Sequence, residues 1–351
     1  SLHDALPICE RMENIMEEIK ISALAQDKAD EVRAAFARME KPGANLGKLE
    51  DMVCSLAAMN GTEVPQSLKP AMLLMCGDHG IAKYGVSAYP QEVTLQMMNG
   101  YRRGTAAATV LARHAGADVF VVDVGTTFDV SHMDNVYHHK VAWGTEDFTQ
   151  GPAMTVEQAE TALRVGIEMA EKCIAEGYNL LYTGEMGIGN TTSTAAIASA
   201  YLGLDPMLTV GRGSGINDER MKIKRQVVVD GLAKNQPRQG DAMDVLCKVG
   251  GYDHAGLAGV ILGAAKHRVP VMIDGVNATA AALIAYGINP SCRDYMLCSH
   301  LSSDISHKAV LELLKLSPIV DAGMRLGEGT GASLAIVVLK AALDMYNKLS
   351  R

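Results

Sequence analysis

The stretch NLLYTGEMGIGNTT, residues 179–192, is a short apolar run that enters a glycine-containing loop and then an alanine-rich segment. An apolar run that stops at such a loop is typical of a buried strand. The same order recurs four times, in KPAMLLMCGDHG (69–80), GADVFVVDVGTT (116–127), VPVMIDGVNATAAAL (269–283) and DYMLCSHLSSD (294–304). Five repeats of strand, loop and helix predict an α/β fold with a doubly wound, mostly parallel sheet covered by helices on both faces.

The two ends of the chain differ from this pattern, because both are rich in residues at helical spacing and lack a strand signal. ADEVRAAFARMEK (29–41) predicts a helix that stops at Pro42-Gly43, and a second helix is predicted from Leu46 to Gly61. We therefore expect a small helical domain from residues 12–65 and 305–351 beside an α/β domain at 66–304. Residues 1–11 are predicted to be a non-native or disordered leader, with Met12 as the true start.

Composition excludes several classes of protein. The 351 residues carry a net charge of -8, which argues against a nucleic-acid binder, and the short basic cluster MKIKR (221–225) is interpreted as an exposed helix face. Seven scattered cysteines without a CxxC pair indicate neither zinc knuckle nor disulfide framework, and they fit a reducing cytosol. No apolar run reaches the roughly 18 residues that a membrane span needs, and no secretory signal is present. A cytoplasmic location is expected.

Ligands of such sheets bind at the carboxyl ends of the strands, so the loops there are the candidate site. TGEMGIGNTT (183–192) precedes a helix and could bind an anion, although Asn190, Thr191 and Thr192 could equally serve as helix caps. VGRGSGIND (210–218) is either a second ligand loop or a turn before a helix capped by Asn217 or Asp218. MRLGEGTGAS (324–333) is the third glycine-rich segment.

Several known fingerprints are absent. The sequence contains no GxxxxGK[ST], no GxGxxG, no GxSxG and no HExxH. His79 and His300 lie in candidate loops, where a single histidine is usually a hydrogen-bonding group. We therefore expect no metal site and no cofactor.

Two acids stand out, Glu185 in GEMG and Glu328 in GEGTG, because each follows a glycine in a candidate loop. A carboxylate in a site that excludes water can have its pKa raised and then act as a base. The alternative is an acid placed near a helix start by the helix dipole. The residues thus indicate an α/β enzyme that uses carboxylate chemistry on a small phosphorylated ligand, without naming that ligand.

Six ordered motifs resemble one family, and the resemblance covers about residues 29–346. KPGANLGKLE, MCGDHGIAKYGVSAYPQEVT, TGEMGIGNTT, KVGGYDHAGLAGVILGAA, SHLSSD and MRLGEGTGAS look like the nicotinate-nucleotide:dimethylbenzimidazole phosphoribosyltransferases of cobamide biosynthesis. The resemblance implies a six-stranded parallel sheet, a small helical domain from both termini and a homodimer. It also implies that the 5-phosphoribosyl group of nicotinate mononucleotide moves to a lower-ligand base such as 5,6-dimethylbenzimidazole, giving α-ribazole 5′-phosphate and nicotinate.

The resemblance also implies roles for individual residues. Glu328 matches the catalytic base. The positions that match substrate-binding residues are Glu185 and Lys222 at the base and ribose, Gln96, Met186 and Leu326 at the base pocket, and Gly187, Gly211, Ser302 and Gly327 at the phosphate and ribose.

One position departs from the pattern, because Tyr89 precedes Pro90 where relatives can have a small residue. Its phenol could change which base fits, or it could pack on a neighbouring helix. Two other hypotheses remain open from the sequence. One is a subunit that activates phenolic or purine bases, possibly with a paralogous partner chain, and the other is a non-catalytic nucleotide-binding protein.

Overall fold

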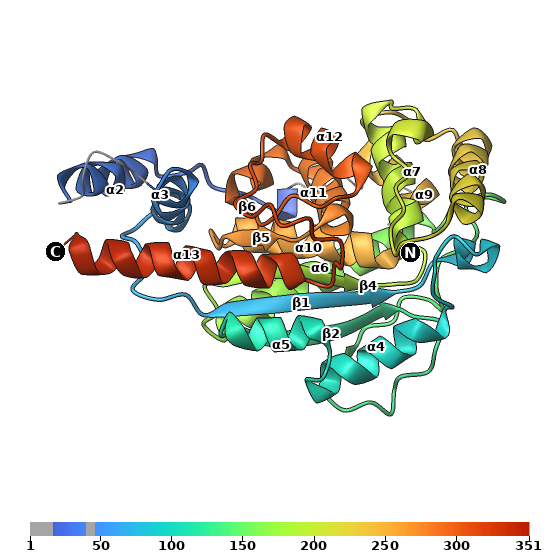
Figure 1. Ribbon diagram of the computed structural model, residues 1–351, viewed down its shortest axis with the longest axis horizontal. Helices are drawn as coiled ribbons and strands as arrows, with labels where there is room; N and C mark the ends of the chain where they lie inside the picture. Colours follow the sequence, from blue (N-terminus) through green and yellow to red (C-terminus); the bar gives the residue numbers. More distant parts are fainter. Residues whose placement is uncertain (1–16, 40–45, 351) are drawn as a thin grey trace.

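The computed structural model describes residues 17–39 and 46–350, so the predicted leader at 1–11 and the helix end at Pro42-Gly43 lie outside the described residues. Its centre is a six-stranded parallel sheet in the order β3-β2-β1-β4-β5-β6 (Figure 1). The strands are β1 (Pro70–Gly77), β2 (Asp118–Gly125), β3 (Val136–His138), β4 (Leu180–Met186), β5 (Val271–Ile273) and β6 (Met296–Cys298). The predicted doubly wound α/β fold is confirmed.

The order of the strands reverses between β1 and β4. The chain moves outward from β1 to β2 and β3, and it then returns to the other side of β1 for β4, β5 and β6. Both central strands are buried along their whole length, which explains why they read as continuous apolar runs. A reversal of this kind leaves a crevice at the carboxyl ends of the strands, where ligands bind.

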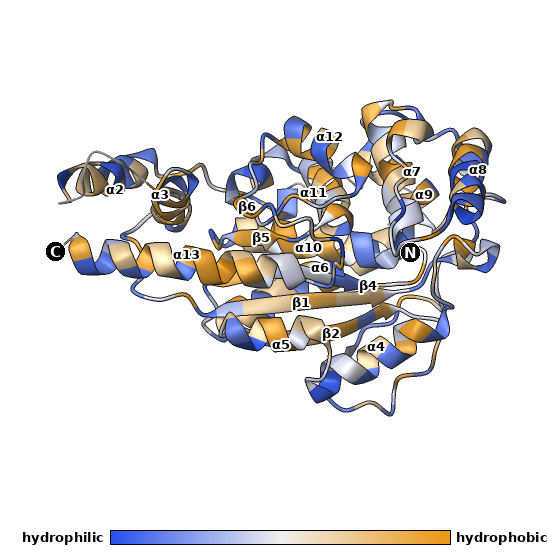
Figure 2. Ribbon diagram, viewed as in Figure 1, coloured by the Kyte–Doolittle hydropathy of each residue, from blue (hydrophilic) through white to orange (hydrophobic). Residues whose placement is uncertain are grey.

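Helices cover both faces of the sheet. α10 packs on α6, β1 and β4, whereas α13 packs on α5, β4 and β5. The helices of the α/β region are α4 (Glu92–Arg103), α5 (Ala107–His114), α6 (Val156–Ala175), α7 (Asn190–Leu202), α8 (Asp218–Asn235), α9 (Ala242–Val249), α10 (Tyr252–Lys266), α11 (Val276–Ile288) and α12 (Ile305–Leu314). α10 and α11 are apolar and buried along nearly their whole length, whereas α8 is rich in hydrophilic residues (Figure 2).

The amino-terminal helices α2 (Gln26–Arg38) and α3 (Lys48–Asn60) pack on each other, and the carboxyl-terminal helix α13 (Thr330–Leu349) passes beside them (Figure 1). The rings of Phe36 and Tyr346 lie 5.0 Å apart between the two ends of the chain. Arg268 ties this region to the sheet, since its guanidinium donates to the carbonyl oxygens of Ala23 and Ala58, each at 3.1 Å. By contrast, α12 packs on α11 and α7, within the α/β region.

Within the described residues, six cysteines are buried and none forms a disulfide, while Cys9 lies outside them. No helix among those residues is long and apolar enough to cross a membrane.

Candidate active site

A cavity of about 590 Å³ opens at the carboxyl ends of β4, β5 and β6. Its size falls in the ordinary range for small-molecule sites. Eight of the predicted site residues line it: Tyr89, Glu185, Met186, Gly187, Ser302, Leu326, Gly327 and Glu328. These residues come from four separate segments of the chain, which the parallel topology brings to one edge of the sheet.

Two helices begin at the cavity wall without a side-chain cap. α7 follows Gly189 and α11 follows Gly275, and neither glycine can supply a capping oxygen. In α7 the N–H groups of Asn190 and Thr192 already donate to the carbonyls of Gly187 and Gly189, and the other first-turn N–H groups of the two helices are available to an anion. α12 differs, because Asp304 caps it by accepting from the backbone N–H of Ser306. The two uncapped helix starts are the natural places for a phosphate or carboxylate group of a ligand.

The loop that carries Glu328 is held in an unusual conformation. Gly327, Glu328 and Gly329 all have positive φ, at 83°, 60° and 78°. A side chain at Gly329 is excluded, since a Cβ there would lie 2.3 Å from the Sδ atom of Met72. The buried carboxylate of Asp274 fixes the loop by accepting from the N–H groups of Gly329 and Ala332, at 3.0 and 2.9 Å. Left-handed backbone at a non-glycine residue is strained, and such strain is concentrated at functional sites.

Burial raises the pKa of Glu328 to about 7, the nearby Tyr101 hydroxyl opposes this rise, and the charge of Asp274 adds to it. Oε2 of Glu328 and the Tyr101 hydroxyl each lack a hydrogen bond of standard geometry among the described residues, although the hydroxyl lies near enough to the carboxyl to lower its pKa. A carboxylate that titrates near neutrality and lines a cavity is suited to accept a proton.

Glu185 lies next to Glu328, and its Oε1 accepts from the Glu328 backbone N–H at 3.3 Å. Burial raises the pKa of Glu185 to about 8, the charge of Asp253 adds to the rise, and the Asn277 amide opposes it. Both acids of the cavity therefore titrate well above the ordinary range of a carboxyl group.

Two asparagines support this pair, and one of them changes an expectation. Asn190 does not cap α7; it is the first helical residue, and its amide donates to Oε2 of Glu185. Asn277 lines the cavity, and its Oδ1 accepts from the hydroxyl of Thr194 at 2.8 Å. The sequence analysis missed Asn277 and Asp274, although both occur in the quoted segment VPVMIDGVNATAAAL at the end of a predicted strand.

Three predicted site residues do not line the cavity: Gln96, Gly211 and Lys222. Gln96 and Lys222 are exposed on α4 and α8. Gly211 lies against Asp304, because a Cβ at this position would be 2.2 Å from its Oδ2. Gly211 therefore packs behind Asp304, which lines the cavity, and does not line the cavity itself.

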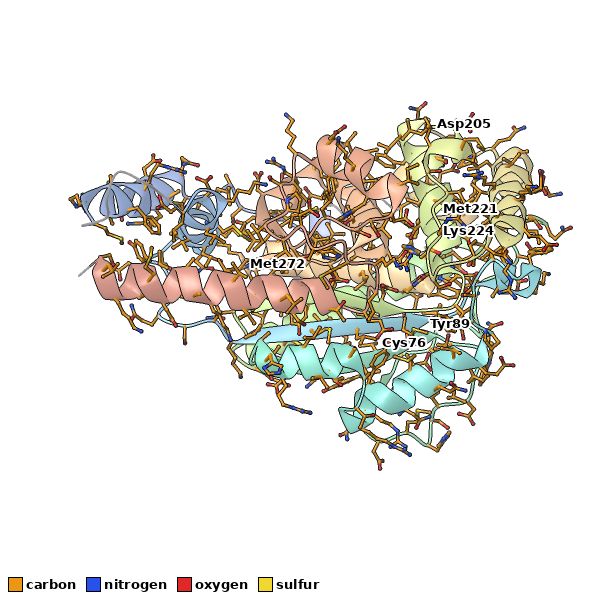
Figure 3. All side chains as sticks on the ribbon, in the orientation of Figure 1. Cys76, Tyr89, Asp205, Met221, Lys224 and Met272 are labelled. Carbon is orange, nitrogen blue, oxygen red and sulfur yellow. The ribbon has the colours of Figure 1, made fainter. Side chains whose placement is uncertain are left out.

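The lysine near the cavity is Lys224, which is fully buried (Figure 3). Its Nζ donates to Thr191 Oγ1 at 2.8 Å and to the Gly211 carbonyl at 3.0 Å. Burial lowers its pKa to about 8, and the charge of Asp304 opposes this change. The interpretation of MKIKR as an exposed helix face is thus wrong at Met221 and Lys224, which are buried. These two residues are three positions apart and share one face of α8, whereas Lys222 lies on a different face.

Tyr89 borders the cavity and remains 56% exposed, so its ring is not buried against a neighbouring helix. Leu326 borders it too, at 54% exposed. Apolar residues that stay exposed beside a cavity are typical of a surface that a ligand covers.

Comparisons with known proteins identify the family and the fold of the chain. A family model described as "Phosphoribosyltransferase" matches residues 21–351. The nicotinate-nucleotide–dimethylbenzimidazole phosphoribosyltransferase of Chloroflexus aggregans is 45% identical over 330 residues, which cover 94% of each chain. The protein of the same name in Geobacter sulfurreducens is 44% identical over 333 residues, covering 94% of this chain and 95% of the relative. The crystal structure of CobT from Thermus thermophilus matches with a TM-score of 0.87 at 41% identity, over 92% of this chain and 96% of that chain.

Proposed function

Because the chain belongs to the nicotinate-nucleotide–dimethylbenzimidazole phosphoribosyltransferase family, we propose that its cavity is the site where a phosphoribosyl group is transferred. The protein is a pentosyltransferase. It moves the 5-phosphoribosyl group of nicotinate mononucleotide to 5,6-dimethylbenzimidazole or a similar lower-ligand base. The products are α-ribazole 5′-phosphate and nicotinate.

The chemistry of the two substrates explains why one carboxylate is enough. Nicotinate leaves from a glycosidic pyridinium, so its departure neutralises a ring charge and needs little help from an acid. The incoming azole must lose its N–H proton, and a base at hydrogen-bond distance performs that step. The change from β to α configuration implies attack from the face opposite the leaving group, so no covalent intermediate is required. The remaining work of the site is to hold the two substrates in line.

One observation carries the assignment of roles, namely that Oε2 of Glu328 is buried at the cavity without a partner among the described residues. A buried oxygen of this kind costs free energy unless a ligand or solvent satisfies it. Its pKa of about 7 leaves a large fraction ionised at neutral pH. We assign Glu328 as the group that removes the azole proton.

The anionic parts of nicotinate mononucleotide suit the uncapped starts of α7 and α11, where backbone N–H groups face the cavity. Arg325 lines the cavity as well and adds a positive charge. Lys224 holds Thr191 and Gly211 in place behind the wall. The apolar edge formed by Tyr89, Met186 and Leu326 suits the flat ring of the accepting base.

The replacement Glu328→Gln tests the assignment. It keeps the size of the side chain and removes its basicity, so we expect turnover to fall by about 10²–10³-fold, within the usual contribution of a general base. Binding of nicotinate mononucleotide, measured by calorimetry, should stay within about twofold. Glu312→Gln, on the exposed face of α12, is the matched control and should retain full turnover. Near-normal turnover of the Glu328 variant would remove this residue as the base.

We also propose that the chain works in the cytosol as a homodimer that needs no paralogous partner. Six buried, unpaired thiols fit a reducing compartment. The purified single chain should turn over 5,6-dimethylbenzimidazole, and light scattering should give twice the mass of the monomer. A chain that turns over phenolic bases only after a second protein is added would contradict the proposal.

A further inference from the structure

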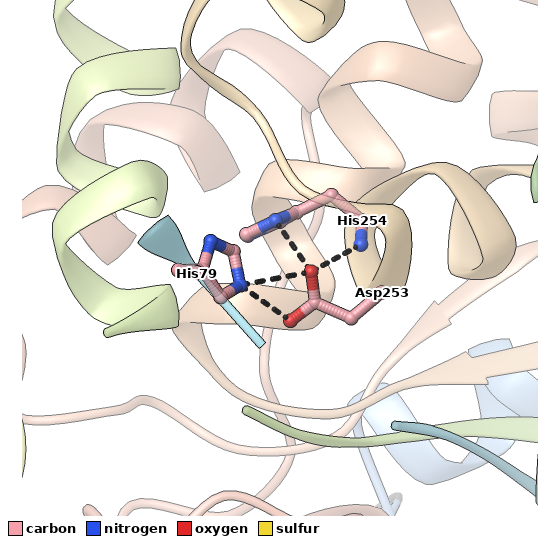
Figure 4. Close-up of side chains that lie close together, drawn as sticks. All are labelled: His79, Asp253 and His254. Carbon is pink, nitrogen blue, oxygen red and sulfur yellow. Dashed lines mark hydrogen bonds and ion pairs between the residues drawn. The ribbon is translucent and has the colours of Figure 1, made fainter. Parts of the chain in front are cut away.

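Three side chains with metal-binding atoms meet beneath the α7 loop, outside the cavity described above. His79 follows β1, whereas Asp253 and His254 lie in the first turn of α10 (Figure 4). All three are about 1% exposed, and their ligand atoms lie within 4.8 Å of one another. His79 and Asp253 are 174 positions apart in the chain, so no spacing in the sequence could have indicated this cluster.

The atoms are spaced as the corners of a coordination shell. Nε2 of His79 lies 3.1 Å from Oδ1 of Asp253, and Nδ1 of His254 lies 3.1 Å from the same oxygen. Two ligands of a tetrahedral ion with bonds of about 2.0–2.1 Å are roughly 3.3 Å apart. The cluster therefore needs little movement to surround one ion.

Hydroxyl groups fix both imidazole rings from behind. Nδ1 of His79 lies 2.8 Å from Ser193 Oγ, and Nε2 of His254 lies 2.8 Å from Thr194 Oγ1. Metal-binding histidines almost always hold their second nitrogen in such a bond, which sets the tautomer and the ring orientation.

The hydrogen-bond pattern around Thr194 places a hydrogen on Nε2 of His254. The Thr194 hydroxyl donates its single hydrogen to Asn277 Oδ1, so Nε2 of His254 must be the donor to that hydroxyl. In the neutral ring, Nδ1 then carries a lone pair that faces the Asp253 carboxylate. Nδ1 is buried without a hydrogen bond among the described residues, whereas Nε2 of His79 lies 3.2 Å from Oδ2 of Asp253 in a hydrogen bond that a bound ion would replace.

We propose that His79, Asp253 and His254 bind one divalent transition-metal ion, of which Zn²⁺ fits the donor set best. Two imidazoles and a carboxylate are a common ligand set for this ion. The ion would join the end of β1 to the start of α10. Through Ser193 and Thr194 it would also fix the start of α7, whose loop lines the active site.

The test is the metal content of the full-length enzyme, purified without a histidine tag and without chelators. Mass spectrometry of the digested protein should find about one zinc ion per chain. Asp253→Asn and His254→Leu should each lower the content below about 0.1 ion per chain, because each removes one of three ligands. His267→Gln, which changes a surface histidine beside Glu171, is the matched control and should keep the ion.

A second measurement needs no variant. Enzyme produced in cobalt-supplemented medium should show the visible d–d absorption of Co²⁺ bound by nitrogen and oxygen ligands. Wild-type protein with less than about 0.1 ion per chain after growth in added zinc, and with no cobalt absorption, would overturn the proposal. Metal that persists in both ligand variants would place it elsewhere and would overturn the proposal equally. Neither outcome depends on transferase turnover, so the proposed function is tested separately.

Discussion

Glu328 and Glu185 are two carboxyl groups that share one cavity, and their surroundings raise both pKa values. Burial affects both, but only Glu185 has the nearby charge of Asp253 among its main influences. Raised pKa values of this kind are typical of carboxyl groups that exchange protons with a ligand near neutral pH.

This arrangement predicts the pH dependence of turnover. The base must be ionised, so kcat/KM should rise with pH through about 7, the pKa of Glu328. Initial rates between pH 5.5 and 8 measure this limb. The Tyr101 hydroxyl lowers the pKa of Glu328, so Tyr101→Phe should move the limb to higher pH. Tyr295→Phe, which removes a buried hydroxyl bonded to the Ser22 carbonyl, should leave it in place. A flat profile over this range would contradict the role of Glu328.

Glu185 predicts a pH dependence of stability. Its pKa is about 8 in the folded protein against an ordinary value of 4.5, so the unfolded chain loses its proton first. The contribution of Glu185 to the free energy of unfolding is complete below about 4.5 and is lost as the pH rises to about 8. Thermal unfolding should show a smaller decline over this range for Glu185→Gln than for wild type. Parallel curves for the two proteins would exclude a raised pKa.

At the scale of elements, the amino end of α13 depends on one buried residue. Asp274 accepts from two backbone N–H groups there, and an asparagine can replace only one of these acceptor oxygens. We expect Asp274→Asn to lower the free energy of unfolding by about 2 kcal/mol, because a buried donor is left without a partner. Asp241→Asn, at the N-cap of α9, is the control; it accepts from one backbone N–H and its ion pair with the exposed Arg238 contributes little, so asparagine should cap nearly as well. Chemical denaturation of both variants measures the difference, and equal effects would refute it.

The elements also show what the sequence could predict. Continuous apolar runs identified β1, β2, β4, β5 and β6, since a strand buried on both faces has a simple pattern. β3 has three residues and only its first is buried, so no apolar run revealed it. Asn217 caps α8 as one of the expected alternatives, because capping depends on a local bond.

The residues that the sequence placed wrongly or missed depend on contacts between distant segments. Lys224, rather than Lys222, reaches Thr191 because of the rotation of α8 against α7. Asp274 binds N–H groups of a loop more than 50 positions away. Local sequence patterns contain no information on contacts between distant segments. The candidate loops could therefore be predicted from the sequence, but the contacts between their residues could not.

At the scale of the whole molecule, Arg268 connects α2 and α3 to the sheet. We expect Arg268→Ala to leave turnover within about twofold. The amide hydrogens of the two helices should exchange roughly tenfold faster, because a loss of about 1.4 kcal/mol of local stability raises the exchange rate tenfold. Arg164→Ala is the control, because its ion pair with Glu18 is exposed at the surface and contributes little. Exchange that accelerates in the sheet as strongly as in the two helices would show that the chain unfolds as one unit.

The left-handed backbone at Glu328 has a consequence for engineering this protein. Glycine or asparagine would relieve that conformation, so a library of variants screened only for heat tolerance should enrich them at position 328. Each such substitution would raise stability but remove the proposed catalytic base. Heat tolerance and turnover should therefore be selected together, because at this position they favour different amino acids.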